Sequence, residues 1–248
     1  MSSTLMAHLV AAYPDPETAH AAARGMVEGG ARYIEVQFPF SDPSADGPAI
    51  QAACHEALLG GFRVAEGFDF VRQLSSETDA RIFIMAYASI PWTWGFERFC
   101  KAAKDAGAAG LIVPDLPPDQ DEGLYKIAAS HGLDMVPVLV TTAGEDRIQA
   151  ALAHKPRYLY AALRAGITGT RTELGEQNLS FLDRISDGTL RVLGGFGISE
   201  RDQVELLDPH VYGVVVGSAF VREITEAASH GPEEVRMRVR RLAAELVG

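Results

Sequence analysis

The feature that most constrains this chain is a regular alternation between short apolar runs and longer segments with a helical pattern. Eight apolar runs recur along the 248 residues. Each run is nearly continuous in apolar residues, which is typical of strands that are buried on both faces, and such strands are usually parallel. We predict strands at residues 6–12, 32–38, 82–87, 109–114, 134–140, 157–163, 190–195 and 211–216.

The segments between these runs predict helices. The first, DPETAHAAARGMVEGGA (15–31), opens with Asp15 and Pro16, two good first-turn residues, and runs out at Gly29 and Gly30. Eight strands that alternate with helices over this length are typical of a (β/α)8 TIM barrel, an α/β fold. No linker divides the chain, so we predict a single barrel domain over residues 1–248. A doubly wound sheet is the alternative, but it normally has fewer strands and often a phosphate fingerprint after the first.

Composition and charge exclude several classes of function. The formal net charge is −11 and the pI is near 5.1, so the overall field repels nucleic-acid backbones and anionic membranes. A small phosphate ester can still bind through backbone N–H groups. The two cysteines form no zinc-binding pattern. The sequence shows neither a signal peptide nor an apolar run of bilayer-spanning length. We therefore expect a cytoplasmic protein.

Acidic residues stand in unusual surroundings in YIEVQFPFSDPSADGPAIQ (33–51). Glu35 lies inside the second apolar run, with no basic residue adjacent to it. If it points into the barrel near its C-terminal end, it is partly desolvated, with a raised pKa suited to proton transfer. The alternative is a structural glutamate bonded to backbone groups. Asp42 and Asp46 lie in the proline-rich loop that follows, and each is a candidate either for function or for turn capping.

Glycine-bearing stretches follow the last three predicted strands. GGFGIS (194–199) and VVVGSAF (214–220) come after the seventh and eighth strands, where barrels often bind phosphate with glycine-rich loops and a helix N-terminus. The alternative is that these glycines only make tight turns. GITGT (166–170), after the sixth strand, is either a third loop near the phosphate or an ordinary flexible loop.

Several other chemistries lack their residues. The seven histidines show no paired spacing for a metal ion, and no nucleotide-binding glycine motif is present. A Schiff-base aldolase is disfavoured because no lysine falls near the C-terminal end of a predicted strand; the four lysines are Lys101, Lys104, Lys126 and Lys155. What remains is acid–base chemistry by carboxylates on a phosphorylated small molecule, with no cofactor.

The motifs resemble those of one family along nearly the whole chain. IEVQFPFSDPSADGPAIQ (34–51) is similar to the signature region of the tryptophan synthase alpha subunit, whose usual form is close to IELGxPFSDPxADGPxIQ. Five more stretches resemble the family's loops after the first, fourth, sixth, seventh and eighth strands: AAYPDPETA, IVPDLPPDQ, GITGTRTEL, GGFGIS and VVVGSAF.

The resemblance implies a (β/α)8 barrel that cleaves indole-3-glycerol phosphate to indole and glyceraldehyde 3-phosphate, a retro-aldol reaction without metal or organic cofactor. Glu35 matches the general acid/base, and Asp46 matches the acid that hydrogen-bonds the indole N–H. The resemblance also implies a tryptophan synthase beta subunit as partner, in an alpha2beta2 assembly. The implied substrate-binding residues are an active-site tyrosine, a closing loop and a phosphate pocket, which correspond to Tyr160, to Thr168 and Gly169, and to Phe196, Gly197, Gly217 and Ser218.

The chain departs from the family pattern at three places. Only MSSTLM precedes the first predicted strand, so we expect a barrel with a shortened N-terminus. Gln37 replaces the usual glycine, and His8 stands where an aromatic residue often lines the indole site. A strand histidine is more often a hydrogen-bonded core residue than a catalyst.

Two other interpretations of the function stay open: a free-standing indole-3-glycerol phosphate lyase that releases indole, and a barrel that mainly binds and activates its partner.

Overall fold

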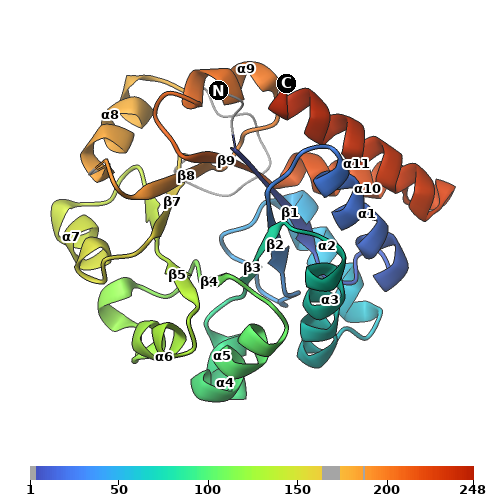
Figure 1. Cartoon of the computed structure of the whole chain (residues 1–248), viewed down its shortest axis with the longest axis horizontal. Helices are drawn as coiled ribbons and strands as arrows, with labels where there is room; N and C mark the ends of the chain where they lie inside the picture. The colour runs from blue at the N-terminus through green and yellow to red at the C-terminus, as the bar shows by residue number, and fades with distance from the viewer. Residues whose placement is uncertain (1–3, 164–173, 187) are drawn as a thin grey trace.

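A barrel of parallel strands forms the centre of the molecule. The computed structural model describes residues 4–163, 174–186 and 188–248. Within these ranges nine strands form one nearly closed sheet, in the order β5-β4-β3-β2-β1-β9-β8-β7-β6 (Figure 1). The predicted fold is confirmed. The strands are β1 Thr4–Val10, β2 Tyr33–Gln37, β3 Arg81–Met85, β4 Gly110–Ile112, β5 Asp134–Val136, β6 Val138–Val140, β7 Tyr158–Ala162, β8 Arg191–Gly195 and β9 Gly213–Val216.

The ninth strand exists because the predicted strand at 134–140 is interrupted at Pro137. Proline has no backbone N–H to donate to a neighbouring strand. Among the described strands, β5 therefore pairs only with β4, and β6 pairs only with β7. The Pro137 carbonyl still accepts a hydrogen bond from Tyr160 N at 2.9 Å. β5 and β6 are two halves of one barrel strand, so the ring keeps the eight positions that the sequence predicts.

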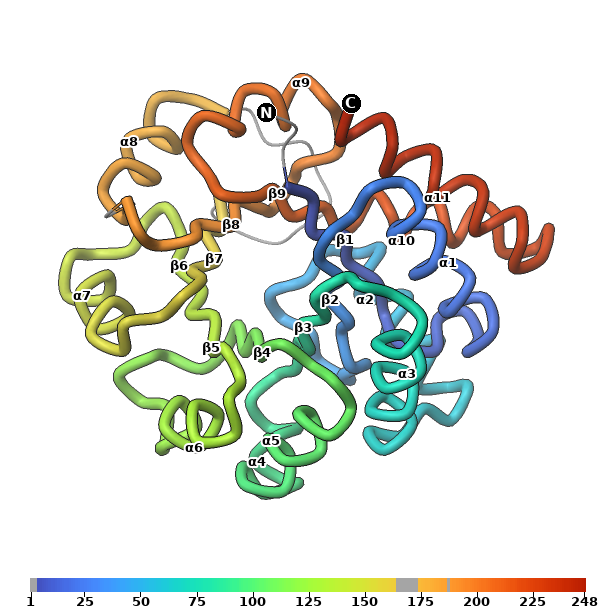
Figure 2. Tube along the Cα trace, viewed as in Figure 1, coloured from blue at the N-terminus to red at the C-terminus, as the bar shows by residue number. Residues whose placement is uncertain are grey.

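Helices surround the strands on the outside, as Figure 2 shows. No helix within the described residues has both the length and the apolar character needed to cross a bilayer. The helices are α1 Pro16–Glu28, α2 Pro48–Leu59, α3 Val64–Glu77, α4 Ser89–Trp94, α5 Phe96–Asp105, α6 Leu124–Ser130, α7 Glu145–Ala153, α8 Glu176–Ile185, α9 Arg201–Leu207, α10 Ser218–Ala227 and α11 Pro232–Val247.

Helix α1 begins and packs as its sequence dictates. The Asp15 side chain accepts a hydrogen bond from Thr18 N at 2.9 Å, and Pro16 occupies the first turn. Gly25 lies where α1 meets α11, and a Cβ at this position would collide with the Arg236 carbonyl oxygen. The close approach of the two helices therefore requires glycine here.

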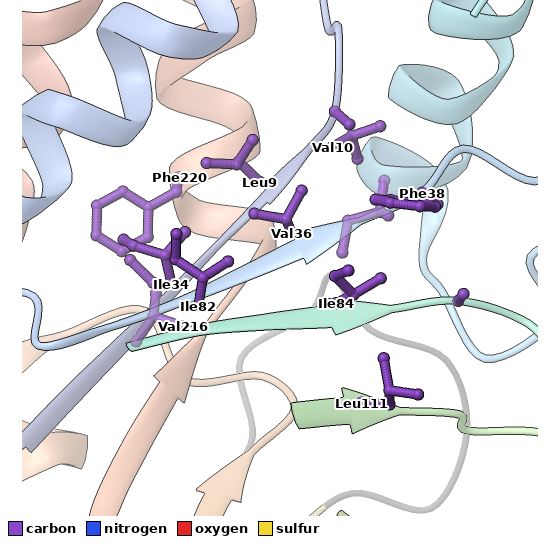
Figure 3. Close-up of a cluster of buried hydrophobic side chains, with 14 of the residues drawn as sticks. Leu9, Val10, Ile34, Val36, Phe38, Ile82, Ile84, Leu111, Val216 and Phe220 are labelled. Carbon is purple, nitrogen blue, oxygen red and sulfur yellow. The ribbon is translucent and has the colours of Figure 1, made fainter. Parts of the chain in front are cut away.

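Side chains alternate between the two faces of each strand and divide the core in two. Along β2, Ile34 and Val36 face the helices, where Figure 3 shows them among buried residues of neighbouring strands and of α10. Tyr33, Glu35 and Gln37 belong to the other face and point into the barrel. The interior is filled mainly by large apolar and aromatic residues, Met6, Tyr33, Phe83, Met85, Tyr87, Ile112, Val136, Tyr158, Tyr160, Leu193 and Val215.

Candidate active site

A pocket opens at the C-terminal ends of the strands, the end at which barrels carry their chemistry. It holds about 660 Å³ of space, including its mouth. The polar residues that line it come from distant parts of the chain, which the barrel brings together. The lining residues are His8, Glu35, Asp46, Ile50, Met85, Ile112, Pro114, Val138, Tyr160, Phe196, Gly197, Ile198, Ser199, Gly217, Ser218 and Arg222.

Glu35 lies in this pocket beside His8. Parallel pairing places the two residues opposite each other on β2 and β1. His8 Nδ1 is 3.0 Å from Glu35 Oε2, and the two residues are only 3% and 5% exposed. Burial lowers the pKa of His8, but the hydrogen bond and the charge of Glu35, with the charge of Asp46, outweigh it and raise that pKa overall. An imidazole ring and a carboxyl group are thus held in contact away from water.

Asp46 reaches the same pocket from the loop after β2. Gln37 Nε2 and Tyr87 OH each donate a hydrogen bond to Asp46 Oδ2 at 2.8 Å. Burial raises the pKa of Asp46, and the nearby charge of Glu35 adds to that rise. The charge of His8 and the two hydrogen bonds act in the opposite direction, because they favour the carboxylate. The two acids of the pocket therefore have different partners, as different catalytic roles require.

The loop that carries Asp46 is fixed by its own hydrogen bonds. Asp46 N donates to the Pro43 carbonyl at 3.0 Å, and Gln51 Nε2 donates to the Asp46 carbonyl at 2.7 Å. Asp42 is exposed and does not line the pocket, and its carbonyl accepts from Ser44 N at 2.9 Å. These contacts support turn formation as the role of Asp42.

Tyr160 forms part of the pocket wall on β7. Its ring lies edge-on to Phe196, with 5.7 Å between the ring centroids. Burial, and then the charges of Glu35 and Asp46, raise the pKa of the Tyr160 hydroxyl well above its usual value. A Cβ at Gly195 would collide with this hydroxyl, so the glycine leaves room for the tyrosine. Tyr160 is therefore a neutral, polar wall of the cavity.

The glycine-bearing loops after β8 and β9 contribute to the lining of the same pocket. Phe196 and Gly197 have φ values of 76° and 80°, which turn the chain sharply after β8. Gly217 precedes α10, and Ser218 is the first residue of that helix. Backbone N–H groups at such a helix start are free to bind an anion.

Arg222 is a pocket residue that the sequence analysis did not single out. It follows Ser218 by four residues on α10, and this spacing puts both on one face of the helix. The helical spacing from Ser218 is the signal that could have identified Arg222.

The predicted residues Thr168 and Gly169 lie outside the described residues. Within the described ranges, no group of three or more metal-binding side chains occurs.

Comparisons with known proteins agree with this geometry. The family model for the tryptophan synthase alpha chain matches residues 2–246. The chain belongs to the tryptophan synthase alpha chain family. The resemblance seen in the sequence is thereby confirmed.

Individual relatives match over almost their whole length. The tryptophan synthase alpha chain of Helicobacter hepaticus is 35% identical over 254 residues, covering 98% of this chain and 95% of that protein. The alpha chain of Leifsonia xyli is 38% identical over 229 residues, covering 91% and 87%. Among solved structures, Mycobacterium tuberculosis tryptophan synthase aligns with a TM-score of 0.88 at 32% identity, covering 100% and 93%. A tryptophan synthase complex from Pyrococcus furiosus aligns with a TM-score of 0.87 at 29% identity, covering both chains completely.

Proposed function

We infer that this protein is a carbon–carbon lyase that cleaves indole-3-glycerol phosphate to indole and glyceraldehyde 3-phosphate, as the alpha subunit of tryptophan synthase in tryptophan biosynthesis. The family to which the chain belongs supports this activity. The observation that carries it is the pocket itself, in which Glu35 and Asp46 share one cavity with the loops at Gly197 and Gly217.

Glu35 is the proposed proton donor and acceptor. As an acid it gives its proton to C3 of the indole, which makes the ring an electron sink. The resulting carboxylate takes the proton of the hydroxyl on the carbon attached to C3. That carbon becomes an aldehyde as the C–C bond breaks, and the bonding electrons restore the indole ring. Glu35 ends the cycle protonated, as it began, so no cofactor is needed to balance the reaction.

Asp46 is proposed to accept a hydrogen bond from the indole N–H. Protonation at C3 leaves positive charge on the ring nitrogen, and an ionised Asp46 stabilises that charge. The donors Gln37 and Tyr87 both bind Oδ2, which leaves Oδ1 for the substrate. Tyr160 is proposed as a wall of the substrate pocket, and Thr168 and Gly169 as part of a closing loop.

The phosphate group of the substrate is proposed to bind at the loops that follow β8 and β9. Phe196, Gly197, Gly217 and Ser218 would offer backbone N–H groups and the start of α10. Arg222 adds positive charge to the same region. A protein with a net negative charge can therefore bind a phosphate ester, because the groups that bind the phosphate lie together at the pocket.

The proposed partner is a tryptophan synthase beta subunit in an alpha2beta2 assembly. The Pyrococcus furiosus relative was solved as a tryptophan synthase complex, which supports this assembly for the present chain. The proposed location is the cytoplasm. Its reducing conditions suit Cys54 and Cys100, which are free and buried.

The test is indole release from indole-3-glycerol phosphate by the purified chain, with and without a beta subunit. We expect slow release that rises sharply when the partner is added. Fast release by the chain alone would identify a free-standing lyase. No release under either condition, with normal binding to the beta subunit, would identify a binding and activating subunit and reject the proposed activity.

A further inference from the structure

His8 is the buried polar side chain of the pocket that the proposed mechanism does not use. It is 3% exposed, and its Nδ1 contacts Glu35. The other ring nitrogen, Nε2, is fully buried and has no hydrogen-bond partner among the described residues. A buried polar atom without a partner is costly, and such atoms often mark a binding site. Because His8 lines the pocket, a bound substrate can supply the missing partner.

The position of the ring indicates which part of the substrate it meets. One nitrogen is 3.0 Å from Glu35 Oε2. On another side, a Cβ built at Gly217 would lie 3.6 Å from the His8 ring atoms Cγ and Cδ2. His8 therefore lies between the proton-transferring acid and a loop proposed to bind phosphate. In the substrate, the hydroxyl-bearing glycerol carbons connect the indole ring to the phosphate, so they must pass this point.

Once Glu35 has given its proton to the indole, the charges around His8 favour the doubly protonated form of His8. The titratable groups that face it from the rest of the pocket are Glu35 on β2, Asp46 after β2, Tyr160 on β7 and Arg222 on α10. Burial lowers the pKa of His8, yet the two carboxylates raise it overall. In the imidazolium form both ring nitrogens are donors. One N–H then binds Glu35, and the second is free to donate.

We propose that His8 is a substrate-binding residue of the cleavage reaction, whose Nδ1–H holds Glu35 and whose Nε2–H donates to the glycerol hydroxyl oxygen that Glu35 deprotonates. This inference rests on the proposed function. As the hydroxyl proton moves to Glu35, negative charge develops on that oxygen before the carbonyl forms. A donor aimed at it from a water-poor site stabilises this charge. His8 itself makes and breaks no covalent bond, so the proton balance of the reaction does not change.

Three substitutions separate the two contacts of His8. His8→Asn keeps an amide near the Nδ1 position, His8→Gln keeps one near the Nε2 position, and His8→Phe removes both donors while keeping a flat ring. We expect kcat for indole release to fall about 10²-fold to 10³-fold in His8→Phe. We expect a smaller loss in His8→Gln than in His8→Asn. Thermal unfolding measured on each variant shows whether the barrel is intact.

The pH profile distinguishes substrate contact from a structural role. The wild-type protein should lose kcat as His8 deprotonates at high pH, whereas His8→Gln, whose amide does not titrate, should lack this limb. His20→Gln is the matched control, since His20 packs against Phe70 with 4.5 Å between ring centroids and does not line the pocket. It should keep both the kcat and the pH profile of the wild type.

A binding measurement tests the proposal even if the chain proves inactive. We would record the 15N signals of the His8 ring while adding glycerol 3-phosphate, a fragment of the substrate. A shift at Nε2, with Nδ1 changed little, is the expected result. Failure of the wild type to release indole, together with that shift, would reject the proposed activity and retain the contact. The contact is wrong if Nε2 does not respond, if His8→Phe keeps kcat within about twofold, or if the high-pH limb persists in His8→Gln.

Discussion

The two ends of the barrel both bury polar side chains, but they differ in how completely the atoms of those side chains are paired. At the N-terminal end, Tyr33 OH is 2.9 Å from Tyr212 OH and 3.4 Å from Tyr158 OH, which also accepts from Arg191 at 2.9 Å. At the C-terminal end, His8 Nε2 and Gln37 Oε1 have no partner among the described residues. Polar groups that satisfy one another stabilise a fold, whereas an unpaired polar atom of a residue that lines a cavity, such as His8, can bind a ligand.

The larger of these two hollows lies at the N-terminal end, away from the candidate active site. It holds about 1680 Å³ of space, including its mouth, against 660 Å³ for the candidate active-site pocket. Its wall mixes arginines with acids such as Glu77 and Asp79. Arg81 Nε is unpaired there, but the same side chain binds Asp134 Oδ2 at 3.0 Å. Size alone therefore does not locate the site. The buried polar residues His8, Glu35 and Asp46, which converge on the smaller pocket, do.

The largest effect is expected at Glu35. Glu35→Gln keeps the shape and a hydrogen-bonding partner for His8 but cannot take or give a proton. We expect indole release to fall about 10³-fold to 10⁴-fold, which is the upper range for general acid–base catalysis. Circular dichroism and thermal unfolding should remain close to wild type. Near-normal release would remove Glu35 from the mechanism.

The second effect is expected at Asp46. Asp46→Asn still accepts hydrogen bonds from Gln37 and Tyr87, but it carries no charge to stabilise the protonated indole ring. We expect kcat to fall about 10²-fold, the usual effect of removing one transition-state electrostatic contact. Steady-state kinetics on indole-3-glycerol phosphate measure this. Unchanged kcat would show that the acid is structural.

A smaller effect is expected at Gln37, which binds Asp46 but not the substrate. Gln37→Leu should lower kcat about tenfold, since hydrogen bonds to charged groups contribute about 1.5–3 kcal/mol. This bond lowers the pKa of Asp46, so its loss should raise that pKa and move the acidic limb of the kcat profile to higher pH. Cys54→Ala is the control, because it removes the other partner of the same amide. An acidic limb that stays in place in Gln37→Leu contradicts the assignment.

At the N-terminal end of the barrel, the substitution Tyr33→Phe should lower stability and leave activity unchanged. Tyr33→Phe removes the hydroxyl that joins Tyr212 and Tyr158, which should lower the free energy of unfolding by about 1 kcal/mol. Urea unfolding measures this loss, and kcat should match wild type. A kcat that falls as much as in Asp46→Asn would break the contrast between the two ends.

The smallest effect is a gain in stability from Asp46→Asn. The folded state raises the pKa of Asp46, so it binds the proton more tightly than the unfolded chain does. Above this raised pKa the buried charge costs stability, and below the unfolded pKa the cost is absent. The variant should therefore be slightly more stable than wild type at pH 7–8, with the difference disappearing as pH falls through the raised pKa. Thermal unfolding across pH tests the trend, and a less stable variant at pH 8 would contradict it.

Much of the fold was readable because the apolar runs are long and continuous. The missed detail was the break at Pro137, although proline inside a run is itself a warning. The polar character of Glu35 and Asp46 in apolar or proline-rich surroundings marks them as candidates, and both line the pocket. Their partners are not marked in this way, because the contacts of His8 and Gln37 depend on strand register and loop path. The pattern of apolar residues within one strand predicts neither the register between strands nor the path of a loop.

The most direct test compares two residues of one strand. Tyr33 and Glu35 both point into the barrel from β2, two positions apart, toward opposite ends. Single-turnover indole release would be measured for Tyr33→Phe and Glu35→Gln side by side, each saturated with the beta subunit. We expect Tyr33→Phe to release indole at the wild-type rate and at least about 10³-fold faster than Glu35→Gln. Rates within tenfold of each other would contradict a site built at the C-terminal end around Glu35.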